Sequence, residues 1–229
     1  MKKILIFASM IVILSSITIA DNNMLALPAK ARFSLGEINT ITLSLTTNGI
    51  YGFQTEINYN SSVLQLANIK NITYGNISDN ITLTTIRFGD FISPAFNLTQ
   101  KISNNTVTLL QTKIGASDNT IGQGTVAYLD FNCSSIAMTN ITLSNITLVR
   151  RNGDILENVL STWQNSQIIC SKKGDTNLDG TIDYTDLLNI ARKYNLCDGQ
   201  SGYDWSYDVS YDGCIDFSDL LLVARNYGI

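Results

Sequence analysis

The chain has 229 residues, of which 45% are hydrophobic and 15% are charged, a composition typical of a folded protein with one or two domains. Its formal net charge of −4, from 19 acidic and 15 basic side chains, argues against a nucleic-acid-binding surface. Histidine is absent, which excludes Ser-His and Cys-His catalytic arrangements and histidine-bound zinc.

The first twenty residues are predicted to be a secretory signal peptide. Lys2 and Lys3 precede an apolar run over Ile4–Leu14, and Thr18-Ile19-Ala20 follows as a small-residue cleavage site. The apolar run is short for a membrane span, which favours cleavage over an uncleaved anchor. We therefore expect a secreted protein, extracellular or associated with the cell surface, with no membrane span in its mature chain.

Residues 21–170 are predicted to form a β domain. Apolar and polar residues alternate in several short runs, as in Ile41–Thr46 and Phe53–Tyr59, and turn signals such as Asn48-Gly49 separate them. The other predicted strands lie at 81–83, 87–88, 107–114, 126–133, 141–143, 146–149 and 167–170. Eight or nine short strands without a long helical pattern favour an antiparallel β-sandwich.

Two further features agree with export. Nine Asn-x-Ser/Thr sequons predict glycosylation if the host carries it out, and they lie at Asn60, Asn71, Asn76, Asn80, Asn97, Asn104, Asn132, Asn140 and Asn145. The four cysteines are an even number, as expected of disulfides outside the cell, and they allow three pairings. We favour Cys133–Cys170 with Cys197–Cys214, because each pair then stays within one domain. No CxxC pair points to zinc.

After residue 170 the pattern changes to two copies of a loop and a helical segment, 33 residues apart. The loops cover residues 175–186 and 208–219. Each has oxygen-bearing residues at alternate positions, a glycine at its sixth position and a carboxylate at its twelfth, which is the spacing of an EF-hand calcium loop. Gly180 and Gly213 allow the sharp turn. The alternative is a pair of Asp-rich turns without metal.

Two calcium ions are therefore predicted, held by oxygen ligands. The ligands of the first are Asp175, Asn177 and Asp179 through side chains, Thr181 through its carbonyl, Asp183 through water and Asp186 as a bidentate carboxylate. The matching residues of the second are Asp208, Ser210, Asp212, Cys214 (carbonyl), Asp216 and Asp219. Because Ser210 is a weaker ligand than Asn177, we expect the second site to bind less tightly. Residues 171–229 contain ten Asp and five basic residues, so two Ca²⁺ would nearly balance their charge.

Each loop leads into a predicted helix, over residues 186–194 and 219–227, whose apolar residues recur at helical spacing. The residues before each loop do not have a helical pattern, whereas an EF-hand has a helix on both sides. A module of this size has few apolar residues for a hydrophobic core. We therefore expect calcium and a disulfide to stabilise it.

The tail, residues 171–229, resembles a type I dockerin, which has tandem calcium loops without entering helices and Asp at the end of each loop. Residues 21–170 resemble a cohesin, the receptor module of dockerins. The segments that carry this looser likeness are residues 50–66 ("IYGFQTEINYNSSVLQL"), 122–131 ("GQGTVAYLDF") and 139–155 ("TNITLSNITLVRRNGDI"). The resemblance implies a mainly β protein with little α structure: a cohesin-like jelly-roll sandwich followed by a small dockerin module stapled by calcium.

The dockerin resemblance also implies a partner-binding surface on the exposed faces of the two helices. By motif position its residues are Tyr184, Thr185, Arg192, Phe217, Ser218 and Arg225. The duplicated faces imply that a cohesin binds in either of two orientations. An aromatic residue stands where many relatives have a small hydroxyl residue, which affects partner specificity. The alternative is that Tyr184 and Phe217 pack inside the module.

Three functions remain to be compared. The leading one is a non-catalytic connector: its tail binds a cohesin-bearing protein and its β domain binds a dockerin-bearing protein, assembling an extracellular complex of the kind that often degrades polysaccharides. The alternative is carbohydrate binding or adhesion through Tyr51, Tyr59, Tyr74 and Phe91, which are otherwise core or strand-face residues. The third is a two-carboxylate glycosidase, for which the nine acidic residues of the β domain offer no distinctive pair.

Overall fold

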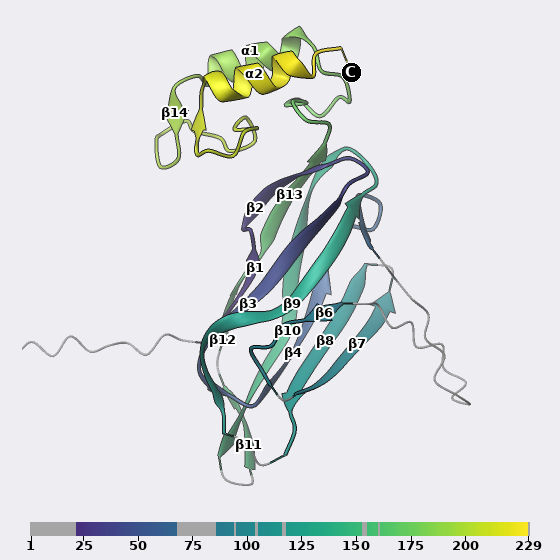
Figure 1. Ribbon diagram of the computed structural model, residues 1–229, viewed down its shortest axis with the longest axis vertical. Helices are drawn as coiled ribbons and strands as arrows, with labels where there is room; N and C mark the ends of the chain where they lie inside the picture. Colours follow the sequence, from purple (N-terminus) through teal and green to yellow (C-terminus); the bar gives the residue numbers. More distant parts are fainter. Residues whose placement is uncertain are drawn as a thin grey trace, which may run out of the picture.

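The computed structural model describes residues 22–67, 86–93, 95–103, 105–115, 118–152, 155–159 and 161–228. They form an elongated β-sandwich with a small helical module at one end (Figure 1). The predicted signal peptide, Tyr74 and four of the sequons (Asn71, Asn76, Asn80 and Asn104) lie outside the described residues. Within the described ranges, no helix is long and apolar enough to cross a membrane.

Two sheets face each other in the sandwich. The first has the strand order β12-β1-β3-β9-β5, with β6 also paired to β9, and the second has the order β2-β13-β10-β4-β8-β7, with β11 also paired to β10. The strands of the first sheet are β1 (Asn22–Leu27), β3 (Ile38–Ile50), β5 (Leu64–Leu66), β6 (Arg87–Phe88), β9 (Thr120–Cys133) and β12 (Ser161–Gln164). Those of the second are β2 (Lys30–Ser34), β4 (Gly52–Asn58), β7 (Ala95–Ser103), β8 (Thr106–Lys113), β10 (Ala137–Asn152), β11 (Ile155–Val159) and β13 (Ser166–Ser171).

Most strand pairs are antiparallel, as expected, but two are parallel: β1 with β12 and β2 with β13. In both, a strand from the start of the domain lies beside one from its end. The runs predicted at 141–143 and 146–149 belong to the single strand β10. The strand is interrupted by a bulge between Ser144 and Thr147, where Asn145 has a φ of 48°.

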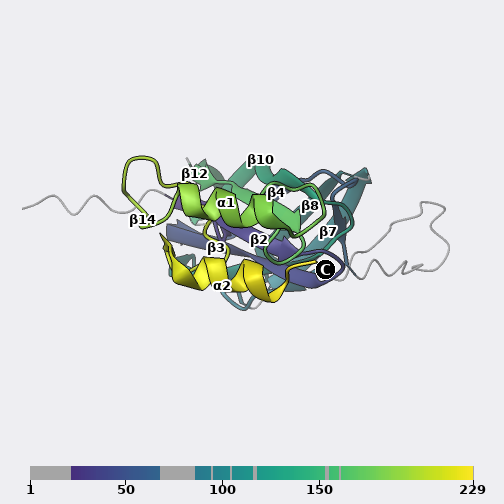
Figure 2. The same ribbon diagram turned by 90° about the horizontal axis from the view of Figure 1, so that it is seen from above.

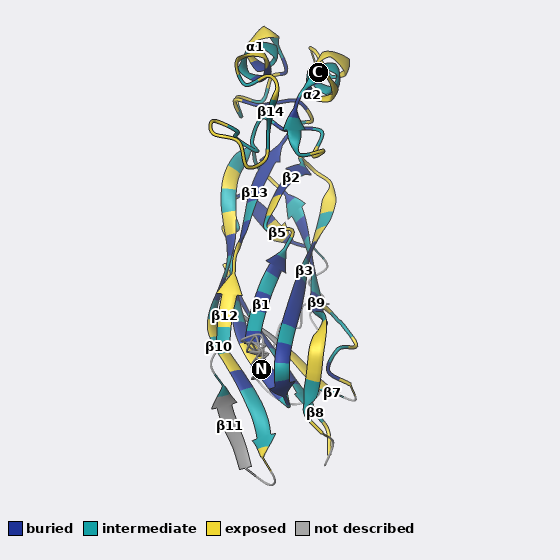
Figure 3. Ribbon diagram, turned by 90° about the vertical axis from the view of Figure 1, so that its left-hand side faces the viewer, coloured by how far each residue is buried: buried dark blue, intermediate teal, exposed yellow. Residues whose placement is uncertain are grey.

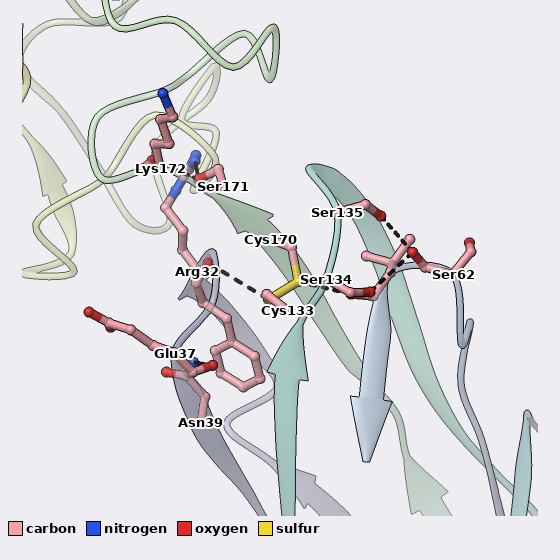
Figure 4. Close-up of a disulfide and its surroundings, with 12 residues drawn as sticks. Arg32, Glu37, Asn39, Ser62, Cys133, Ser134, Ser135, Cys170, Ser171 and Lys172 are labelled. Carbon is pink, nitrogen blue, oxygen red and sulfur yellow. Dashed lines mark hydrogen bonds between the residues drawn. A yellow bond between two sulfur atoms is a disulfide. The ribbon is translucent and has the colours of Figure 1, made fainter. Parts of the chain in front are cut away.

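The alternating apolar side chains fill the space between the sheets, which confirms the sandwich predicted from their period of two. Phe131, Ile41 and Leu43 are fully buried. The ring of Tyr59 packs edge-to-face against Phe131, with centroids 5.1 Å apart. The disulfide between Cys133 on β9 and Cys170 on β13 links the two sheets (Figure 4).

The helical module contains α1 (Tyr184–Arg192), α2 (Phe217–Arg225) and the short pair β14 (Leu196–Cys197) and β15 (Cys214–Ile215). Seen from above, the two helices lie side by side over the end of the sandwich (Figure 2). Apolar residues from both repeats form the small core of the module, namely Ile182, Ile190, Val209, Ile215 and Val223. The second disulfide joins Cys197 to Cys214, so both disulfides have the pairing favoured by the sequence.

Both helices begin two residues earlier than predicted. Asp183 and Asp216 are the N-cap residues, and each forms a capping box with the carboxylate three residues later. Asp186 and Asp219, which were expected at the start of the helices, therefore lie inside the first turn. The difference arises because an N-cap Asp satisfies a free amide of that turn, which makes the earlier start favourable.

Candidate calcium loops and helix groove

The first loop encloses a buried carboxylate that lacks a full set of hydrogen-bond partners. Asp175 is fully buried, and its Oδ2 accepts a hydrogen bond from the Gly180 N–H at 3.1 Å. Its Oδ1 is also buried but has no hydrogen-bond partner. Leu178 and Gly180 have φ values of 61° and 87°, which fold the loop around Asp175. An unpartnered buried carboxylate oxygen is the donor that a hard cation such as Ca²⁺ requires.

The electrostatics of the first loop also favour a bound cation. Burial raises the pKa of Asp175, and the nearby carboxylates of Asp186 and Asp179 raise it further, against the lowering effect of the Gly180 and Leu178 N–H groups. The charged form of Asp175 is therefore disfavoured unless a cation is present. The residues present thus fit a calcium ion.

The side chains of three other predicted ligands of this loop, Asn177, Asp179 and Asp186, form hydrogen bonds within the loop. Asn177 Nδ2 donates to Asp179 Oδ2 at 2.6 Å, and Asp179 Oδ1 accepts from the Thr181 N–H at 2.8 Å. Asp186 accepts from the Thr176 and Asp183 N–H groups, one on each oxygen, at 2.7 and 2.9 Å. Among the described residues, no group of three or more acidic, Cys or His side chains is gathered as a metal site.

The second loop differs at its first position. Asp208 Oδ1 accepts from the Tyr211 N–H at 2.8 Å. Its Oδ2 accepts from the Gly213 N–H at 3.0 Å and from the Tyr203 hydroxyl at 2.8 Å. Both oxygens of Asp208 are therefore satisfied by protein donors, unlike those of Asp175. Tyr203 was missed by the sequence reasoning because it lies outside the repeated motif.

Asp219 ends the second loop as Asp186 ends the first. Its oxygens accept from the Ser210 and Asp216 N–H groups at 2.9 and 2.7 Å. Burial raises the pKa of Asp219, while these N–H groups lower it. The two repeats therefore share one geometry at the junction of loop and helix and differ at the first ligand.

An apolar groove of about 380 Å³ runs between α1 and α2. It is lined by four residues and their counterparts 33 positions later: Tyr184, Leu187, Leu188 and Ala191, with Phe217, Leu220, Leu221 and Ala224. Tyr184 and Phe217 are each 65% exposed, so they do not pack inside the module. Figure 3 shows the helices as the outermost elements at this end of the molecule. The two predicted partner-binding faces thus meet in one shared groove.

The remaining predicted partner-binding residues lie near this groove. Thr185 and Ser218 follow the two aromatic residues and are exposed, and Arg192 and Arg225 are exposed at the last turn of each helix. The structure therefore presents all six predicted residues on the surface of the helix pair. Sequence could not show that the two helices lie together, because that depends on how the repeats pack.

A second apolar surface lies on the outer face of the sandwich. Phe96 and Leu98 on β7 are 54% and 39% exposed, and they pair with Thr112 and Leu110 of β8. Beside them is a depression of about 250 Å³ over Gly52, whose lining includes Gln54, Leu110, Thr112, Thr147 and Val149. Sequence reasoning missed this surface, because only the strand register places these residues on one face.

Of the aromatic residues considered for carbohydrate binding, none of the three that the structure describes has a fully exposed ring. Tyr59 is 6% exposed, and Phe91 packs against the core. The Arg151 guanidinium carbon lies over the Tyr51 ring, 5.6 Å from the ring centroid. The Tyr51 hydroxyl donates a hydrogen bond to the Gly115 carbonyl. Tyr74 lies outside the described residues.

Among the described sequons, Asn60, Asn97, Asn140 and Asn145 are exposed, and Asn132 is half-buried.

Family models match both parts of the chain. The model described as Cohesin domain matches residues 37–164, and the model described as Dockerin type I domain matches residues 173–226. A comparison with curated proteins gives no match.

Solved structures share the fold of the sandwich. The seventh ScaB type I cohesin from Pseudobacteroides cellulosolvens is similar at 12% identity and a TM-score of 0.52, over 66% of this chain and 93% of that one. A non-cellulosomal cohesin from Archaeoglobus fulgidus is similar at 12% identity and a TM-score of 0.51, over 69% and 96%. A chain of the type I Coh-OlpA–Doc918 complex from Clostridium thermocellum is similar at 9% identity and a TM-score of 0.50, over 66% and 99%. At such identities the likeness shows the fold alone.

Proposed function

The chain belongs to the cohesin family and also carries a type I dockerin domain, and on this premise we propose that it is a secreted, non-catalytic connector. Its dockerin, residues 171–229, binds a cohesin of another protein. Its cohesin-like domain, residues 21–170, binds a dockerin of another protein. Both matched domains are interaction modules, which supports a role in assembling an extracellular complex, of the kind that degrades polysaccharides. The observation that carries the proposal is the exposed apolar groove on the helix pair.

The helix groove is the proposed cohesin-binding surface. Its apolar floor favours contact with another protein over exposure to water. Arg192 and Arg225 add exposed charged groups in the last turn of each helix. Its lining repeats at an interval of 33 residues, so closely similar side chains recur when the two helices exchange places, with Tyr184 replaced by Phe217. A cohesin is therefore expected to bind in either of two orientations on this one groove.

The outer face of β4, β8 and β7 is the proposed dockerin-binding surface. The exposed side chains of Phe96 and Leu98 and the hollow over Gly52 combine apolar area with a shape that accepts a side chain from a partner. The two proposed surfaces lie on different modules, so both partners can bind one chain.

Calcium would be held by the predicted ligands of the two loops, with Asp175 and Asp208 as the first ligand of each. The ion supplies positive charge to buried carboxylates and fixes the turn that starts each helix. Because Asp175 has an unpartnered oxygen and Asp208 does not, the first loop gains more from the ion. A calcium titration is expected to show two unequal sites, with the tighter binding lost in Asp175→Asn. Two equal sites, or a tighter second site, would contradict this assignment.

Binding measurements on the full chain test the connector role. We expect a type I cohesin from a panel to bind in calcium and not in EDTA, and the double variant Tyr184→Ala/Phe217→Ala to weaken binding by about tenfold or more. Tyr227→Ala is the matched control, because Tyr227 is exposed outside the groove lining. Binding of the full chain to a panel of dockerins is measured in the same way, and the double variant Phe96→Ser/Leu98→Ser is expected to weaken it.

Two results would contradict the connector role. One is unchanged cohesin binding in the groove variant, and the other is retardation of the full chain in gels that contain soluble glucans. Size measurement with and without calcium shows whether the tail binds the β domain of its own chain.

A further inference from the structure

The connection between the two modules is short and packed. β13 pairs with β2 as far as Ser171, opposite Ser34, and only residues 172–174 separate this strand from the first loop. Gly174 has a φ of +101°, and a Cβ placed there would lie 3.1 Å from Val223 Cα. The last residue of the linker therefore packs against the helical module, which leaves little slack between the modules.

Arg32 on β2 reaches from the sandwich into the helical module. Its guanidinium donates to Ser171 Oγ at 2.5 Å, to the Asp175 carbonyl at 2.7 Å and to the Ser206 carbonyl at 2.6 Å. Figure 4 shows the side chain extending from β2 toward Ser171, close to the Cys133–Cys170 disulfide.

These acceptors come from separate parts of the chain. Ser171 ends the sandwich, Asp175 begins the first loop, and Ser206 stands two residues before the second loop. A guanidinium is planar and has five fixed donors, so it can bridge several acceptors that a single ammonium could not. Arg32 therefore joins the sandwich to both repeats at one point.

Other contacts at the junction agree with this arrangement. The Lys30 ammonium lies 5.8 Å from the centre of the Trp205 ring, between β2 and the segment that precedes the second loop. A Cβ at Gly180 would lie 3.2 Å from Ile136 Cδ1, so the turn of the first loop touches the sandwich. The ion pair of Lys173 with Glu37, at 3.7 Å, is exposed and adds little.

We propose that Arg32 latches the helical module onto the end of the sandwich, so that the two modules behave as one rigid body. The latch holds the helix groove at a fixed angle to the outer face of the sandwich, and it turns the calcium loops toward the sandwich. Two of its acceptors are main-chain carbonyls in or beside the loops, so it forms only while both loops keep their shape. This last point rests on the calcium sites proposed above, whereas the latch itself requires no partner.

Cleavage of the full chain by endoproteinase Lys-C tests the latch. Lys172 and Lys173 lie in the linker, and neither disulfide crosses it, so cleavage there separates the modules. In calcium, wild-type protein is expected to resist cleavage. Arg32→Ala is expected to be cut about tenfold faster, because it loses several hydrogen bonds from a charged donor. Arg87→Ala is the matched control, since Arg87 pairs with Asp130 on the sandwich away from the junction.

A second measurement separates loosening from unfolding. ¹⁵N relaxation of the full chain in calcium gives a rotational correlation time for the sheet and another for the helices. The two times are expected to agree in wild type and in Arg87→Ala, and the helices of Arg32→Ala are expected to tumble faster than its sheet. If Arg32→Ala does not fold, Arg32→Lys decides, because it keeps the charge and stem and loses the bridge. A folded Arg32 variant that resists cleavage and tumbles as one body overturns the proposal.

Discussion

The sandwich and the helical module are stabilised in different ways. The sandwich buries a continuous apolar core between two sheets, with large side chains such as Phe131 and Met24 fully enclosed. The module buries only five apolar side chains, and beside them it buries the carboxylates Asp175, Asp186, Asp208 and Asp219. We therefore expect hydrophobic burial to be the main stabilising term in the sandwich, and a bound cation to contribute more to the module, where it would offset the cost of the buried carboxylates.

The pKa of the partly buried Asp130 in the sandwich and the pKa values of the buried Asp175 and Asp219 in the module shift in opposite directions. In the sandwich, burial raises the pKa of Asp130, but hydrogen bonds from Thr40 and Arg87 and the charge of Arg87 outweigh it, and the pKa falls. In the module, burial raises the pKa of Asp175 and of Asp219. The charged form of Asp130 thus stabilises the sandwich, whereas the charged forms of Asp175 and Asp219 destabilise the metal-free module.

Calcium removal is the largest test of this contrast. With free Ca²⁺ about 1,000-fold above Kd, each site adds about 4 kcal/mol to the stability of the module. EDTA at neutral pH is expected to abolish the helical circular-dichroism signal while the sheet signal stays. A module that keeps its helices in EDTA would show that its apolar core suffices. Magnesium at the same concentration is the control, because it fits such loops poorly.

A cavity in the sandwich is the converse test. Phe131→Ala is expected to cost the sandwich about 3–5 kcal/mol, because the removed ring leaves a void in a fully packed core. Urea unfolding in calcium is followed by the sheet signal and the helix signal separately. In Phe131→Ala the urea midpoint of the sheet signal should fall more than that of the helix signal. Phe131→Leu is the control and should cost less. Equal loss of both signals in Phe131→Ala would indicate that the module has no stability of its own.

The linker glycine offers a smaller test. Gly174→Ala is expected to destabilise the module by about 1–3 kcal/mol, since the position has a positive φ and the new methyl group would press on Val223. Gly199→Ala is the matched control: its φ is +83°, but nothing lies within 4 Å of a Cβ there. The difference between the two losses in thermal unfolding measures the packing of the linker. Equal losses would mean that backbone strain alone matters.

Acidification is expected to give the smallest effect. Asp175 and Asp219 have raised pKa values in the folded module, so their cost to the metal-free protein is present above the unfolded pKa and disappears as pH falls toward it. Asp130 has a lowered pKa, so its contribution is present above the unfolded pKa and is lost as pH falls through the folded one.

Circular dichroism in EDTA between pH 7 and pH 3 checks both signs. The helical signal should partly return on acidification, while the sheet becomes slightly less stable at the acid end. In Arg87→Ala the sheet should lose about 1 kcal/mol or less, and its acid sensitivity should fall. A helical signal that declines steadily with pH would contradict the assignment for the module.

Local patterns predicted much of this structure. The alternation in Phe53–Tyr59 predicted β4, and the motif at 175–186 predicted a loop and the helix after it. The same reasoning missed other strands. The strands β1, β2, β5, β7, β11 and β12 of the sandwich were not predicted, because their place in the sheets depends on pairing with other strands. Both helices begin two residues before their predicted starts, because Asp183 and Asp216 act as N-cap residues. From the sequence, these two residues were considered only as loop ligands.

The sequence alone determined the order of the two modules, the spacing of the calcium loops and the preferred disulfide pairing, because each depends on residues near one another or on composition. Tertiary structure decided that the faces of Tyr184 and Phe217 form one groove and that Phe96 and Leu98 lie beside the hollow over Gly52. It also decided that Arg32 meets Asp175 and Ser206. These contacts join residues far apart along the chain, and only packing and strand register bring such residues together.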